Sequence, residues 1–224
     1  MSSLSPLNNT AFLQQIIIAV LGWSWIEYLA VGLRLARKLW RGMADEGMYE
    51  VLEYETTLEL KNKLGNKAVF SKRQKVKYLQ NNIIAYQDQA WGDGEILLDY
   101  SCSPGIEADR YRPDQKTYIL ISLREEKQKG DMDEFHIEWG IKDGFLRSDE
   151  QWGATISHRT HFLKSQIIFP KSRPPIQAWA VEQLSNKKHL LDQNTTQLPD
   201  GRWLVQWETK RPRLHENYII KWEW

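Results

Sequence analysis

Residues 49–60 read YEVLEYETTLEL, and this stretch decides the fold class of the chain. In an extended strand, successive side chains point to opposite faces. Leu52, Tyr54, Leu58 and Leu60 then share one face, while three of the glutamates share the other. Such an alternation is typical of an antiparallel strand with one face in a core and one face in water. We therefore predict a β-domain that begins at about this point.

The chain downstream repeats this kind of segment. Ten further stretches have strand composition and are separated by turns rich in Gly, Pro and Asp; they span 68–70, 76–79, 83–86, 96–100, 118–124, 135–141, 162–169, 176–184, 203–208 and 218–224. Short strands at this spacing predict an antiparallel β-sandwich or barrel over residues 49–224. The chain has eleven tryptophans, most of them in this region, which predicts a large aromatic core.

The sequence before the β-domain has a different character. No charged residue occurs from Met1 to Ile26, and a helix of residues 12–33 would be roughly 30 Å long, about the thickness of a bilayer's hydrocarbon core. We predict a flexible lead at residues 1–10, a membrane-anchor helix at residues 11–43 and a joint at residues 44–48. The anchor residues are Ile16, Ile17, Ile18, Val20, Leu21, Trp23, Trp25, Leu29, Arg34, Arg37, Lys38 and Arg41.

The charges around this helix predict its orientation. Four cations follow the apolar run, and no cation precedes it. Under the positive-inside rule this favours a single span with the N-terminus outside and the β-domain in the cytoplasm. The carboxyl of Glu27 would seek a second copy of the helix in hydrocarbon, so we expect a homo-oligomer formed through the helix. Two alternatives stay open: an amphipathic helix in the membrane surface, and a packing helix in a soluble oligomer.

Composition limits the chemistry that the chain offers. The formal charge of +1 gives no argument for a nucleic-acid partner. Cys102 is the only cysteine, which excludes an intramolecular disulfide and a four-cysteine zinc site. His158 and His161 are three residues apart, and on a strand this spacing points them to opposite faces. We therefore expect no metal and no cofactor.

Charge is segregated along the chain. Seven cations lie between residues 61 and 77, and six acids lie between residues 88 and 109. One interpretation is an anion-binding surface for lipid headgroups or a nucleotide, with contacts from Lys72, Arg73, Lys75 and Lys77. The other is that neighbouring hairpins pair their opposite charges across the sheet. The sequence slightly favours the pairing.

A second candidate surface lies in the segment around residue 160. Arg159 with His158 and His161 would form a polar rim, joined by Trp152 and by Arg173 beside two prolines. Arginine and aromatic residues on loops are frequent in binding surfaces. We found no phosphate loop, dinucleotide fingerprint or nucleophile elbow.

These observations favour a membrane-anchored cytoplasmic β-domain that binds a ligand or a protein, as a sensor or adaptor. The layout of a short span followed by a β-domain is similar to that of membrane-tethered effectors in bacterial nucleotide-signalled defence. That resemblance implies a nucleotide-gated effector as an alternative, which a closed barrel with a polar lumen near Arg159 or Arg173 would favour. A second alternative is a hydrolase using Cys102 or a histidine, which a thiol–histidine hydrogen bond in a cleft would favour.

Overall fold

The computed structural model describes residues 47–224, and these form strands with one short 3-10 helix, η1 (Asp192–Asn194). The predicted lead, anchor and most of the joint lie outside the described residues. No helix in the described part is long and apolar enough to cross a bilayer.

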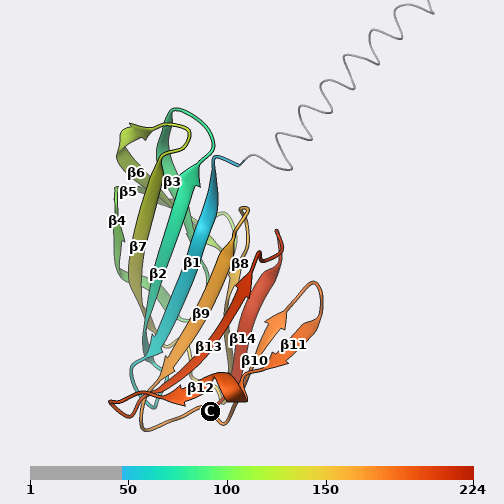
Figure 1. The fold of residues 1–224 in the computed structure, drawn as a ribbon. Coiled ribbons are helices and arrows are strands. Elements are labelled where there is room, and N and C mark those ends of the chain that lie inside the picture. The colour runs from blue at the N-terminus through green and yellow to red at the C-terminus, as the bar shows by residue number, and fades with distance from the viewer. Residues whose placement is uncertain (1–46) are drawn as a thin grey trace, which may run out of the picture. The chain divides into compact units, whose positions relative to one another are not determined.

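The strands form three sheets, drawn in Figure 1. The seven-stranded sheet has the order β12 (Thr195–Gln197), β13 (Trp203–Lys210), β9 (Phe162–Phe169), β1 (Tyr49–Leu60), β2 (Lys67–Tyr78), β7 (Met132–Lys142) and β4 (Glu95–Ser103). The four-stranded sheet has the order β11 (Lys187–Leu190), β10 (Gln177–Glu182), β14 (Asn217–Glu223) and β8 (Asp149–Thr155). The three-stranded sheet has the order β3 (Ile83–Ala90), β6 (Thr117–Lys127) and β5 (Ile106–Tyr111).

Both small sheets cover the same face of the large sheet. Phe70 and Lys72 are two residues apart in β2 and therefore point to one side. The Phe70 ring packs against Trp152 of β8, with centroids 5.2 Å apart, and Lys72 pairs with Asp88 of β3. The core lies between these two layers, which makes the domain a sandwich. The alternative of a closed barrel is not realised, because the large sheet ends at β12 and β4.

The strand that decides the fold class differs from its prediction at one residue. The pairing of β1 with β2 slips between Val51 and Glu53, so Leu52 is the extra residue of a β-bulge. The bulge shifts the alternation, and Tyr49 and Val51 are buried on the core side before it. Leu52 is therefore not part of the core face that we predicted.

Two further expectations need correction. The sheet is not wholly antiparallel, because β1 runs parallel to β9 from Tyr54 to Glu59. The predicted strands at 68–70 and 76–79 are one strand, β2, whose polar middle hid its continuity. The strands β5, β8, β11 and β12 were not predicted, since each is short and carries few apolar residues.

Candidate functional site

A cavity of about 950 Å³ is built on the four-stranded sheet. One wall is the sheet face that points away from the core, with side chains from β8, β14 and β10: Gln151, Thr155, Asn217, Ile219, Lys221, Trp179 and Val181. The rest of the lining includes residues of three turns, at 91–93, 112–116 and 144–147. We call this cavity the tryptophan groove, because Trp91, Trp152, Trp179 and Trp222 line it.

Trp91, Trp152 and Trp179 are half-buried, so each offers part of its ring to the cavity, whereas Trp222 is buried. Lys116 lies over the Trp91 ring, with its Nζ 5.0 Å from the centroid. Trp152 is fixed from the core side by Phe70 and Phe145. Its indole N–H is buried and has no acceptor within residues 47–224, and neither has that of Trp222. Fixed aromatic rings supply contact area at low entropic cost, which suits a binding site.

Positive charge in the tryptophan groove is only partly compensated. Arg147 pairs weakly with Asp93, at 3.9 Å between two exposed groups. Arg112, Lys116 and Lys221 have no ion-pair partner in the part of the chain that the structure describes. The acids Asp149 and Glu150 lie on the same cavity; Glu150 accepts a hydrogen bond from the backbone N–H of Arg147 at 2.8 Å, and burial raises its pKa. Arg112, Lys116 and Lys221 are therefore the cations of the groove that could pair with a carboxylate or phosphate of a ligand.

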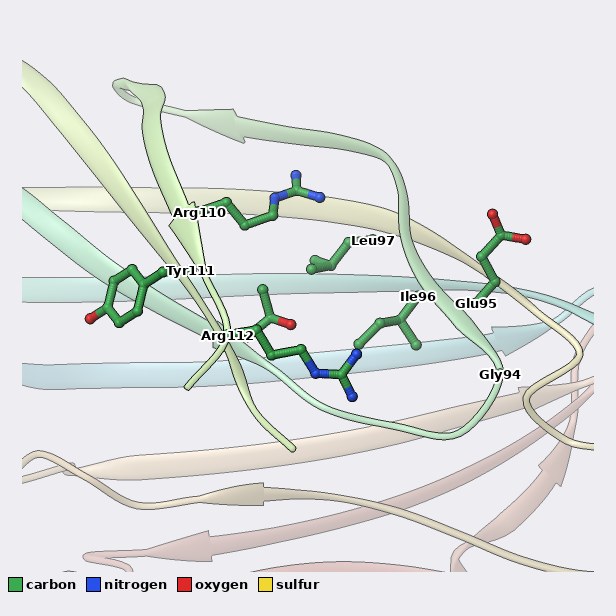
Figure 2. A pocket seen from close by; sticks show the side chains of 8 residues that line it. Gly94, Glu95, Ile96, Leu97, Arg110, Tyr111 and Arg112 are labelled. Atoms are coloured by element: carbon green, nitrogen blue, oxygen red, sulfur yellow. The ribbon is translucent and has the colours of Figure 1, made fainter. Parts of the chain in front are cut away.

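A second pocket, of about 610 Å³, adjoins the groove at Arg112. Figure 2 shows the Arg112 side chain extending toward Ile96 on β4. The neighbouring Arg110 is already occupied, because it donates two hydrogen bonds of 2.8 Å to Glu107. Leu97, at the base of the pocket, has φ of 63°, which is strained for a branched side chain. Arg112 is thus the cation that both cavities share.

The predicted anionic-contact residues do not form one surface. Lys72 points into the core, where its Nζ pairs with the Asp88 carboxylate and lies 3.5 Å from the Tyr86 hydroxyl. Burial lowers the pKa of Lys72, but the adjacent Asp88 carboxylate outweighs it and the pKa is raised. Lys72 therefore does not share a surface with Arg73, Lys75 and Lys77, because residues 72 and 73 of a strand face opposite sides.

The other three cations of β2 lie on the solvent face. Arg73 pairs with Glu55 at 2.8 Å and with Glu134 at 3.0 Å, and it also contacts Glu53. Lys75 stands opposite Glu53 on β1 and Glu134 on β7, and Lys77 stands opposite Glu50. The acids that neighbour these cations come from β1 and β7, and not from the acidic segment at 88–109.

The predicted polar rim is divided between the two ends of β1. At the start of β1, the His158 ring stacks on Tyr49 with centroids 4.3 Å apart, and His161 Nε2 lies 3.0 Å from Glu50. Arg159 is exposed there, and its backbone oxygen accepts a hydrogen bond from Val51. Burial lowers the pKa of His158.

Arg173 lies at the other end of β1. Its guanidinium stacks 3.8 Å from the Trp224 centroid and donates to the backbone oxygens of Lys63 and Trp224, at 3.1 and 3.2 Å. It fastens the C-terminus to two loops. Of the five predicted binding residues, only Trp152 lies in the tryptophan groove.

The Cys102 thiol is not placed for catalysis in this structure. Its Sγ lies 4.0 Å from the Gly105 oxygen, and burial raises its pKa, so the thiol is protonated at neutral pH. His136 lines the same pocket of about 440 Å³, but its Nε2 pairs with Glu134 at 3.0 Å. Within residues 47–224, no group of three His, Cys, Asp or Glu side chains could hold a metal ion.

Sequence reasoning missed five of the groove residues: Trp91, Arg112, Lys116, Trp179 and Lys221. Trp179 and Lys221 come from β10 and β14, and the other three come from the turns that follow β3 and β5, so only the packing of separate sheets brings them together. A tryptophan beside the Gly-Asp-Gly turn and an arginine before Pro113 were visible in the sequence. Neither feature predicts which loops lie next to one another in the folded domain.

Comparisons with known proteins show similarity of fold alone. No family model and no curated protein matches the chain. An M1 zinc metallopeptidase from Deinococcus radiodurans is similar in structure, with 10% identity and a TM-score of 0.48 over 77% of this chain and 42% of that one. A mutant of a two-domain M1 zinc metallopeptidase bound to L-tryptophan gives 9% identity and a TM-score of 0.49 over 79% and 43%. The chain thus spans less than half of these structures, and no activity carries over from them.

Proposed function

We propose that this chain is a membrane-anchored binding module whose β-domain takes up a ligand in the tryptophan groove. The observation that carries the proposal is the meeting of four tryptophans with three cations that have no ion-pair partner in residues 47–224, all at one cavity of about 950 Å³. Aromatic and cationic residues around a concave site are the usual means of holding a ligand that has both an apolar and an anionic part.

Binding is favoured over catalysis by the chemistry of the groove. No histidine or cysteine lines it, and the Cys102 thiol elsewhere is protonated and bonded to a backbone oxygen. A nucleophilic mechanism needs an activated nucleophile beside a general base. A closed barrel with a polar lumen near Arg159 or Arg173 would have favoured the nucleotide-gated effector. The sheets form no such barrel, and the two arginines lie at opposite ends of β1.

The proposal includes the anchor that the sequence predicts: residues 11–43 span the membrane once, the β-domain lies in the cytoplasm, and the helix brings copies together. We expect the full chain to resist carbonate extraction and to be released by detergent. We expect residues 44–224 alone to be soluble and to show the circular dichroism of a β-protein. Release of the full chain by carbonate, or an unfolded truncated chain, would contradict the anchor.

The groove is tested separately, with the full chain in detergent micelles. Three probes are compared: a displayed library of random peptides, a panel of nucleotides, and a water-soluble short-chain phosphatidylserine. We expect one probe class to bind, and Trp179→Ala or Arg112→Glu to weaken that binding about tenfold or more. The matched control is Lys188→Glu on β11, a charge reversal outside the groove. Binding that is unchanged by both Trp179→Ala and Arg112→Glu would contradict the tryptophan groove as the binding site.

A further inference from the structure

The strand β8 is an unprotected sheet edge. Proteins usually guard such edges with short strands, lysines, prolines or bulges, because a row of free N–H and C=O groups attracts another strand. In the described sheets, β12 has 3 residues, β11 has 4 residues with two lysines, and β3, β4 and β5 each have register shifts. By contrast, β8 pairs with β14 over its whole length without a shift, and its sequence DEQWGAT has no lysine or proline.

The alternation of the hydrogen bonds between β8 and β14 shows which backbone N–H and C=O groups of β8 face the open edge. The Trp224 N–H donates to Ser148 at 3.1 Å, and the Ile156 N–H donates to Glu216 at 3.0 Å. Bonded pairs alternate along an antiparallel ladder, so the even-numbered residues of β8 are bonded to β14. The backbone N–H and C=O groups of Asp149, Gln151 and the later odd-numbered residues therefore point away from the sheet.

These edge-facing groups lie in the tryptophan groove. Asp149, Gln151, Gly153 and Thr155 all line it. Gly153 leaves the middle of the edge without a side chain, and a Cβ there would come within 2.3 Å of the Tyr218 oxygen. A strand laid along β8 would thus gain main-chain hydrogen bonds inside a cavity that already carries aromatic rings.

The charges around the edge select what such a strand would carry. Arg112 and Lys116 line the same groove from the turn between β5 and β6, and Lys221 stands beside Gln151 on β14; none of the three has an ion-pair partner within residues 47–224. The acids of the lining are Asp93, Asp149 and Glu150, so the first two residues of β8 carry negative charge and the cations lie farther along. A carboxylate on the incoming strand would compensate the charge of these cations. We propose that β8 receives an extended, acidic peptide segment of a protein partner, which becomes the fifth strand of the four-stranded sheet. This inference rests on the proposed function, because it names the ligand class of the same groove.

The test uses the full chain in detergent micelles and a displayed library of random 12-residue peptides as probe. We expect the selected peptides to be rich in Asp and Glu. Gln151→Pro removes an edge-facing N–H without removing a bond to β14, whereas Gln151→Ala removes only the side chain. We expect Gln151→Pro to weaken the binding of a selected peptide about tenfold relative to Gln151→Ala.

A second arm leaves the protein unchanged, in case the proline variant does not fold. The selected peptide is N-methylated at successive positions, and we expect affinity to fall at every second position only, since one edge of a strand faces β8. Peptide binding could be unchanged by Gln151→Pro and by every N-methyl group but lost in Arg112→Glu. That result would overturn strand addition, while the tryptophan groove would remain the binding site. Binding that ignores all of these changes, binding through β8 by peptides without acids, or failure to enrich any peptide would also overturn the inference.

Discussion

At the scale of single residues, two charged side chains account for how the three-stranded sheet attaches to the large one. Lys72 and Asp88 are both almost fully buried, 7% and 2% exposed, and they pair across the interface of β2 and β3. The Tyr100 hydroxyl donates to the other Asp88 oxygen at 3.2 Å. Burying two charges is costly unless each satisfies the other. The pair therefore selects this packing of the sheets and no shifted one.

Removing one member of the Lys72–Asp88 pair should destabilise the domain more than removing both members. We expect Lys72→Met or Asp88→Leu alone to lower the free energy of unfolding by about 3–5 kcal/mol, because each leaves a buried group without its partner. The double variant should lose less than either single variant. Urea unfolding of the four proteins measures the cycle, and simple additivity of the two losses would show that the pair is not coupled.

His158 should make the domain sensitive to mild acid. Burial against Tyr49 lowers its pKa in the folded state. A group with a lowered pKa contributes stability that is present above its unfolded pKa of about 6.5 and is lost as the pH falls through the folded value. We expect the melting temperature to fall between pH 7.5 and 5, and to fall less in His158→Phe. An equal fall in both proteins would assign the effect to the other histidines.

At the scale of elements, β2 shows what sequence patterns can and cannot give. The sequence predicted its two apolar ends as separate strands, at 68–70 and 76–79, and the charges of its polar middle hid that they are one strand with a polar face. The same charges on that face suggested an anion surface, but the sequence could not say that Lys72 would turn inward to meet Asp88. A partner sixteen residues away is invisible to a local pattern. The strand β8 was missed for a similar reason, because an edge strand needs few apolar residues.

The outward lysines of β2 remain candidates for membrane contact. Lys77 lies beside Tyr49's end of β1, which is only a few residues from the predicted anchor. We expect Lys75→Glu with Lys77→Glu to weaken the binding of residues 44–224, which lack the predicted anchor, to phosphatidylserine vesicles at low salt, and the difference to fade as salt screens it. The control is Lys187→Glu with Lys188→Glu on β11. Equal vesicle binding by both variants would leave cross-strand pairing as the role of these lysines.

At the scale of the whole molecule, the class of the fold could be predicted from the sequence, and most of the candidate site could not. Alternating residues and turn chemistry are local properties, and they correctly predicted a mainly β domain while leaving a sandwich and a barrel open. Trp152 was the one predicted binding residue that lies in the groove, and its partners Trp179 and Arg112 are far from it in sequence. The parallel pairing of β1 with β9 joins residues more than a hundred positions apart. Such pairings decide which loops meet, and no single stretch encodes them.

The most direct test of the account is residue-resolved hydrogen exchange of the full chain, with and without a peptide selected for binding. The amides of Gln151, Gly153 and Thr155 face the open edge, while those of Trp152 and Ala154 are bonded to β14. We predict that the peptide slows exchange at the first three and at the turn of residues 112–116, and leaves the other two nearly unchanged. Slowing confined to other strands, with β8 and this turn unaffected, would contradict the tryptophan groove as the binding site.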